Sequence, residues 1–116
     1  VEDHPRLRRR ALQVLQGLGY HVVDMDNGEA ALAALSVRDD IDLLFTDIVM
    51  PGPLDGIGLT EAARKLHPRL KVLFTTGYAE YTEINPDLLN RDGDLLRKPY
   101  ARRDLANKIR DLLDRT

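Results

Sequence analysis

The chain has 116 residues, of which 43% are hydrophobic and 31% charged, and its formal net charge is -2. This size and composition predict one domain with its own hydrophobic core, and they exclude the basic excess typical of nucleic-acid-binding proteins. The sequence has no cysteine, which removes disulfides and thiolate metal sites and is typical of a reducing compartment. The apolar runs are too short to span a bilayer, and we expect no signal peptide.

Helices and short apolar strands alternate along the chain. In chain order, the pattern predicts a helix over residues 5–18, a strand over 20–25, a helix over 27–35, a strand over 42–46, a helix over 58–66, strands over 71–76 and 94–98, and a helix over 104–113. Residues 78–93 have no clean apolar stripe, and we expect a short helix flanked by loops there. Alternation of this kind predicts parallel strands with helices on both faces of the sheet.

Polar side chains gather where the predicted strands end. Asp47 follows the strand over 42–46, Thr76 ends the next strand, and Lys98 ends the last. Glu2 and Asp3 stand just before the first helix, where a preceding strand would end. In open parallel sheets, the chemistry lies outside the carboxyl ends of the strands. The sequence therefore predicts that these five side chains line one rim of the sheet.

Three carboxylates on one rim repel each other, and a divalent cation with oxygen ligands relieves that repulsion. Mg²⁺ suits such a site because it accepts a few carboxylates, backbone carbonyls and retained waters. A hydroxyl and an ammonium on the neighbouring strands would bind a dianionic phosphoryl group. An aspartate can accept that group as an acyl phosphate. The pattern therefore indicates Mg²⁺-dependent phosphoryl transfer to Asp47.

Each of these residues also has a simpler interpretation. A single aspartate after a strand is usually a turn or cap residue, and Glu2 with Asp3 can cap a helix. Thr76 and Gly77 can be turn residues, and Lys98 can be a solvated edge side chain. Each simpler interpretation is favoured when it is taken alone. Their placement on one rim in this order favours the functional one.

Five short motifs carry a resemblance to a known family: ED at 2–3, TDIVMPG around Asp47, DG at 55–56, TTG at 75–77 and KP at 98–99. With them, the chain resembles the receiver domain of two-component response regulators over nearly its whole length. The resemblance implies an α/β, flavodoxin-like, doubly wound parallel sheet of five strands in the order 2-1-3-4-5, forming one receiver domain over residues 1–116. Only Val1 precedes the acidic pair, so the first strand is largely missing and we expect the sequence to be truncated upstream.

The resemblance implies a phosphoacceptor and a metal site. Asp47 is similar to the family's phosphoacceptor. Glu2 and Asp3 resemble its acidic Mg²⁺ residues, with Asp47 and the backbone carbonyl of Val49 as the further ligands.

The resemblance also implies residues that bind the phosphoryl group. Thr76 matches the family's switch hydroxyl, because it directly precedes the small residue Gly77, which leaves room for the phosphoryl group. Lys98 matches the lysine that pairs with the phosphoryl oxygens. Pro99 is expected to hold the lysine's loop, through a cis peptide bond.

The sequence departs from the family in three places. The aromatic switch position, three residues before the lysine, holds Leu95. The turn MPGPLDG is one residue longer than usual, and together with TTGYA and LLRKPY it resembles receivers attached to hybrid sensor histidine kinases. Val49 and Tyr78 flank the acceptor and, with Leu95, are the candidates for tuning the site. Ala101 stands where a Ser or Thr cap often begins the last helix, so we expect that helix to begin less firmly.

The resulting hypothesis is a cytoplasmic phosphorylation switch, which accepts a phosphoryl group from a histidine kinase or a histidine phosphotransfer protein. It is not a turnover enzyme by itself, although the parent chain could be a histidine kinase. No direct nucleic-acid partner and no membrane insertion are expected, and a homodimer stays open. A non-phosphorylated interaction module of the same fold is the first alternative. An aspartyl-phosphate, Mg²⁺-dependent phosphatase is the second, and it is disfavoured because Ile48 and Val49 stand where its second acid is needed.

Overall fold

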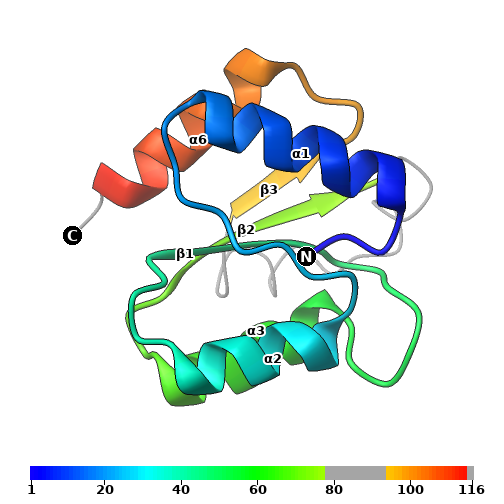
Figure 1. Ribbon diagram of the computed structural model, residues 1–116, viewed down its shortest axis with the longest axis vertical. Helices are drawn as coiled ribbons and strands as arrows, with labels where there is room; N and C mark the ends of the chain where they lie inside the picture. Colours follow the sequence, from blue (N-terminus) through cyan, green and yellow to red (C-terminus); the bar gives the residue numbers. More distant parts are fainter. Residues whose placement is uncertain (78–93, 115–116) are drawn as a thin grey trace.

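The computed structural model describes residues 1–77 and 94–114, so the expectation for residues 78–93 lies outside the described residues. Its elements, in chain order, are α1 (Pro5–Gly17), α2 (Gly28–Val37), β1 (Leu43–Asp47), α3 (Gly56–Leu66), β2 (Lys71–Thr76), β3 (Asp94–Arg97) and α6 (Arg102–Asp114). In the described part of the chain, the strands form one parallel sheet in the order β1-β2-β3 (Figure 1). This order matches the 3-4-5 part of the predicted arrangement.

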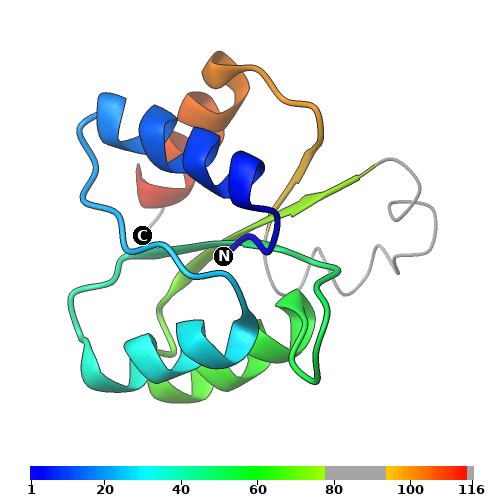
Figure 2. The same cartoon turned by 45° about the vertical axis from the view of Figure 1, so that its right-hand side comes forward.

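Helices cover both faces of this sheet. Helices α1 and α6 lie on one face and α2 and α3 on the other, as the two views in Figures 1 and 2 show. The apolar cluster on the α2 and α3 side contains Leu59 and Phe74, and the cluster on the α1 and α6 side contains Leu73 and Leu105. All four side chains are fully buried. Each such side chain stabilises the fold by about 1.5–3 kcal/mol, so the two clusters fix the layers.

The helix starts follow from side chains that satisfy free backbone N–H groups. The Asn27 side chain accepts a hydrogen bond of 2.7 Å from the Ala30 N–H, as its position in the sequence predicts. Helix α6 begins at Arg102, two positions earlier than predicted. There the Asp104 carboxylate accepts a bond of 3.2 Å from the Ala101 N–H. The expected weak start at Ala101 is therefore offset by an acid one turn further on.

The strand predicted over residues 20–25 is wrong for this structure, because no strand is assigned there. The segment receives one hydrogen bond of the ladder type, from the Glu2 N–H to the Met25 carbonyl at 3.1 Å. On the other side of the same short stretch, the Asp47 N–H donates to the Val1 carbonyl at 3.1 Å. Val1 and Glu2 thus lie between the end of segment 20–25 and the end of β1 and are hydrogen-bonded to both. Away from these ends, no strand among residues 1–77 and 94–114 lies between segment 20–25 and β1. Alternation of apolar residues cannot produce a strand without a neighbour to pair with.

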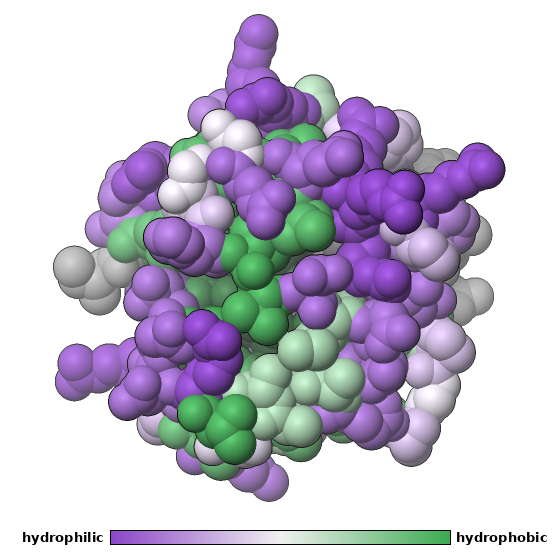
Figure 3. Space-filling model, in the orientation of Figure 1, coloured by the Kyte–Doolittle hydropathy of each residue, from purple (hydrophilic) through white to green (hydrophobic). Residues whose placement is uncertain are grey.

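A groove of about 610 Å³ lies between residues 20–25 and β1. Its walls are largely apolar and come from α1, α2, α6 and β1; they include Leu15, Val22, Leu43 and Phe45. Hydrophobic residues gather along the middle of this face of the molecule (Figure 3). Within the described residues, β1 is therefore an edge strand with an apolar trough beside it.

Candidate functional site

Asp47 is the last residue of β1, at the carboxyl end of the sheet. The strand continues its pairing for one more residue, because the Ile48 N–H donates to the Thr75 carbonyl at 3.0 Å. The chain then turns back, and the Gly56 N–H donates to the Ile48 carbonyl at 2.9 Å. A Cβ at Gly56 would lie 2.0 Å from the Asp47 carbonyl oxygen, so only glycine permits this close approach. The DG motif therefore holds the start of helix α3 directly against the end of the strand that carries Asp47.

Glu2 and Asp3 lie beside Asp47, as the sequence predicts. Glu2 is buried and Asp3 is exposed. One carboxylate oxygen from each of Glu2, Asp3 and Asp47 lies within 4.8 Å of the others. The His4 N–H donates to Glu2 Oε2 at 3.2 Å, which fixes the direction of that side chain. The fold therefore brings together the acids at residues 2–3 and the acid at residue 47, which lie far apart in the sequence.

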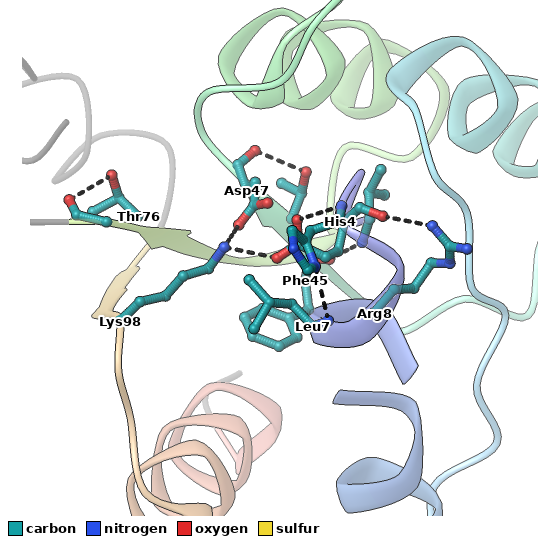
Figure 4. A network of polar contacts seen from close by, with 11 residues as sticks. His4, Leu7, Arg8, Phe45, Asp47, Thr76 and Lys98 are labelled. Atoms are coloured by element: carbon teal, nitrogen blue, oxygen red, sulfur yellow. Dashed lines mark hydrogen bonds and ion pairs between the residues drawn. The ribbon is translucent and has the colours of Figure 1, made fainter. Parts of the chain in front are cut away.

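Lys98 points into this acidic group from the loop after β3 (Figure 4). Its Nζ lies 2.8 Å from Asp47 Oδ1 and donates to Glu2 Oε1 at 2.7 Å. Its backbone N–H donates to the Thr76 carbonyl at 2.8 Å. The Lys98–Pro99 peptide bond is cis, as expected. A single ammonium thus contacts two of the three clustered acids.

The electrostatics of the group follow from burial and shared hydrogen bonds. Burial, and then Glu2, raise the pKa of Asp47 to about 8. Burial alone would raise the pKa of Glu2, but hydrogen bonds with Asp47 and Lys98 outweigh it and lower that pKa to about 2. Burial would likewise lower the pKa of Lys98, but its contacts with Asp47 and Glu2 outweigh this and raise it. The pair of buried acids therefore keeps one proton near neutral pH, and Lys98 stays charged.

The two threonines at the end of β2 differ in their contacts. Thr76 is 2% exposed, and its hydroxyl donates to the Gly77 carbonyl at 3.4 Å (Figure 4). Thr75 is the strand partner of Asp47, and its buried hydroxyl has no hydrogen-bond partner within residues 1–77 and 94–114. An approach of the Thr76 hydroxyl to a phosphoryl group on Asp47 stays a prediction.

The candidate tuning residues lie at different depths. The Val49 side chain is 52% exposed, two positions after Asp47 in the chain. Leu95 is partly buried and packs against the apolar cluster under α2 and α3. Tyr78 lies outside the described residues. The role of the Val49 carbonyl as a ligand is a prediction that rests on the resemblance.

Two contacts of the site were missed from the sequence. Arg8 Nη1 donates to the Glu2 carbonyl at 3.1 Å, and its Nε lies 3.6 Å from Asp24 Oδ2. No spacing rule links Arg8 to the acidic pair, because the contact depends on the direction of α1 relative to residues 2 and 3. The second is an edge contact between the rings of Phe45 and Tyr100. The position of Tyr100 directly after the KP motif is the signal that could have found it.

The donor set fits a hard divalent cation. All three clustered groups offer carboxylate oxygens, one of them is exposed, and sulfur and imidazole ligands take no part. Mg²⁺ prefers a small number of carboxylates and keeps several waters, which an open rim allows. A cation here would also favour loss of the proton that the acids share.

Comparisons with known proteins decide which family has this arrangement. The family model described as "Response regulator receiver domain" matches residues 1–110. The chain belongs to the response regulator receiver domain family. It is therefore a phosphoacceptor domain of two-component signalling, with the CheY-like flavodoxin fold, and domains of this kind interact with histidine kinases or phosphotransfer proteins.

The relatives of this receiver domain include a small regulator and a large kinase. The chain is 42% identical to the response regulator receiver protein CpdR of Brucella abortus, over 97% of this chain and 92% of CpdR. It is 31% identical to the sensor kinase CckA of the same organism, over 99% of this chain but 12% of CckA. The crystal structure of the NtrX receiver domain from Brucella abortus has a TM-score of 0.89 and 26% identity, over 99% of this chain and 96% of that one. Attachment to a hybrid kinase thus stays a prediction.

Among the helices within residues 1–77 and 94–114, none combines the length and the apolar character that a membrane span needs.

Proposed function

We propose that Asp47 is the residue that accepts the phosphoryl group, with Mg²⁺ bound by Glu2, Asp3, Asp47 and the Val49 carbonyl. The observation that carries this proposal is the position of Asp47: a buried carboxylate at a strand end, 2.8 Å from the Lys98 ammonium and clustered with two further carboxylates. Such an arrangement stabilises charge that develops on a phosphoryl group in transit.

In the proposed transfer step, the protein donor is a phosphohistidine of a histidine kinase or a phosphotransfer protein. An ionised Asp47 oxygen attacks phosphorus, the new O–P bond forms, and the P–N bond to the imidazole breaks. The imidazole leaves with the electron pair of that bond and takes a proton from solvent. Mg²⁺ held by these carboxylates would supply positive charge that offsets the charge of the phosphoryl oxygens. Lys98 holds its positive charge beside the same oxygens, and the Thr76 hydroxyl is the donor proposed for one of them.

The phosphoryl group on Asp47 would carry about -1.5 to -2 charge. Lys98 already contacts both Glu2 and Asp47, so a phosphoryl group would draw it away from Glu2. Because the Lys98 N–H is bonded to the Thr76 carbonyl at the end of β2, any displacement that reaches the Lys98 backbone would affect the ends of β2 and β3 together. We propose this coupling as the way in which phosphorylation changes the surface around β3 and α6.

Intact-mass analysis after incubation with a small phosphodonor and Mg²⁺ tests the acceptor. The wild type should gain one acid-labile, hydroxylamine-sensitive phosphoryl group, and Asp47→Asn should gain none. Asp55→Asn is the matched control, because Asp55 is an exposed acid that caps α3. Continued labelling of the Asp47→Asn variant would contradict the assignment. An unlabelled wild type would favour the interaction-module alternative.

A further inference from the structure

The Lys98 ammonium is the only positive charge described in contact with the Asp47 carboxylate, among residues 1–77 and 94–114, yet it sits on a flexible stem. Lysine is a compact charge with four rotatable methylenes, so its place depends on how its backbone is held. On one side, the Lys98 N–H is bonded to the Thr76 carbonyl at the end of β2.

The other side of the loop is held by an aromatic contact. Two residues after Lys98, the Tyr100 ring meets the Phe45 ring edge-on, with centroids 6.1 Å apart and an angle of 61° between the planes. Phe45 lies on β1, two residues before Asp47, and successive residues of a strand alternate between its faces. Phe45 and Asp47 therefore share a face of the strand. The ring contact joins the lysine's loop to the strand that carries the acceptor.

We propose that Tyr100 is a positioning residue, whose ring on Phe45 fixes the Lys98 backbone so that the ammonium lies beside Asp47. The inference rests on the proposed function, in which Lys98 pairs with the phosphoryl oxygens. The loop is then clamped at two points, by a hydrogen bond to β2 and by an aromatic edge on β1. Aromatic pairs of this geometry stabilise a fold by more than their buried area predicts. The contact therefore favours one orientation of the Tyr100 ring, in addition to burying apolar surface.

The ring of Tyr100, rather than its hydroxyl, carries this role. Tyr100 is partly buried and packs against the apolar cluster that contains Leu73 and Leu105. Burial raises the pKa of Tyr100, so its phenol stays neutral and adds no charge to the site. Phenylalanine should therefore replace it with little loss, whereas an aliphatic residue of similar bulk should not.

The competing explanation is that Tyr100 only fills space in the apolar cluster. A space-filling role predicts loss of stability whatever residue stands at position 98. A positioning role predicts an effect that passes through Lys98 and disappears when the ammonium is absent. A double-mutant cycle separates the two, because it measures whether the effects are coupled.

The test uses Tyr100→Leu, Tyr100→Phe, Lys98→Ala and the Tyr100→Leu/Lys98→Ala double variant. The rate of labelling by a small phosphodonor with Mg²⁺ is measured for each. Tyr100→Leu should slow labelling by about 10- to 100-fold, the range expected when a charged group is displaced by an ångström or so, and Tyr100→Phe should restore it. In the Lys98→Ala background, Tyr100→Leu should cause no further loss. An equal further loss in that background overturns the proposal.

A second measurement decides the inference independently of phosphorylation. The Lys98 ammonium should give a slowly exchanging ¹H–¹⁵N signal in the wild type and in Tyr100→Phe, and Tyr100→Leu should lose that signal. If Tyr100→Leu keeps the signal, Tyr100 does not position Lys98. A wild type that shows the signal but accepts no phosphoryl group refutes the proposed function and leaves the positioning role supported.

Discussion

The proton held by Asp47 gives the metal-free domain a distinctive pH dependence. The pKa of Asp47 is raised from 3.8 to about 8, so between these values the folded chain keeps a proton that the unfolded chain has lost. Rising pH across this window therefore favours unfolding, and the free energy of unfolding should fall by a few kcal/mol, on the order set by the shift. Glu2 acts in the opposite sense at lower pH, since its pKa is lowered from 4.5 to about 2 and its contribution is lost on acidification.

Urea unfolding at pH 5 and pH 8, without metal, measures this effect. The wild type should be less stable at pH 8, and Asp47→Asn should lose most of the difference because its amide does not titrate. If the free energy of unfolding changed equally between pH 5 and pH 8 in the wild type and in Asp47→Asn, another group would cause the pH dependence.

The clustered carboxylates predict stabilisation by Mg²⁺. Binding to the folded state alone stabilises a protein by about 2.7 kcal/mol at about 100 times the dissociation constant. Thermal unfolding should therefore shift upward with Mg²⁺ for the wild type and much less for Asp3→Asn, which loses one of the three clustered acids. Asp39→Asn is the control, because Asp39 is exposed and precedes β1 at the opposite end of that strand. Equal shifts for both variants would remove Asp3 from the site.

At the scale of the elements, the glycine that begins α3 sets how closely the helix approaches β1. Gly56→Ala would place a Cβ 2.0 Å from the Asp47 carbonyl oxygen and 2.8 Å from the Ile48 Cα, both backbone atoms. The helix must shift, and we expect a loss of about 1–3 kcal/mol or more in the free energy of unfolding. Urea denaturation measures it.

Gly58→Ala is the matched control in the same helical turn. Its Cβ would first meet the Leu54 Cδ1 atom at 3.2 Å, which is the end of a flexible side chain. Alanine also favours a helix over glycine by about 1 kcal/mol, so the two effects should nearly cancel. Similar losses for both variants would mean that the close approach at Gly56 is not what constrains the helix.

The elements show which parts of the molecule local sequence can predict. The strand Lys71–Thr76 and the Asn27 cap were predicted because each depends on the chemistry of a few consecutive residues. Segment 20–25 was predicted as a strand and is not one, because a strand needs a partner strand and a local apolar pattern cannot supply it. For the site, strand ends and motifs predicted that Glu2, Asp47 and Lys98 meet, and they do. The Arg8 contact depends on tertiary packing, which no local pattern encodes, whereas the Tyr100 contact had only its place after the KP motif as a signal.

At the scale of the whole molecule, the groove beside β1 predicts dye binding. Residues 1–116 should bind the hydrophobic dye ANS in the folded state, because the groove is open and its walls are largely apolar. Ala11→Glu, in the groove wall, should reduce the fluorescence. Ala33→Glu, on the exposed side of α2, should not. Equal fluorescence for the two variants would place the dye elsewhere.

The bridge between Lys98 and Glu2 joins positions 96 apart in the chain. Closing so long a loop has a large entropic cost, so this contact is expected to form only after the local helices and neighbouring strands have assembled. If β3 or the start of α1 were unfolded, Lys98 would therefore be separated from Glu2 and the site would not form. If Asp47 is the phosphoacceptor, as proposed, its phosphorylation would depend on more than a donor, because it would also require residues 2, 47 and 98 to have come together.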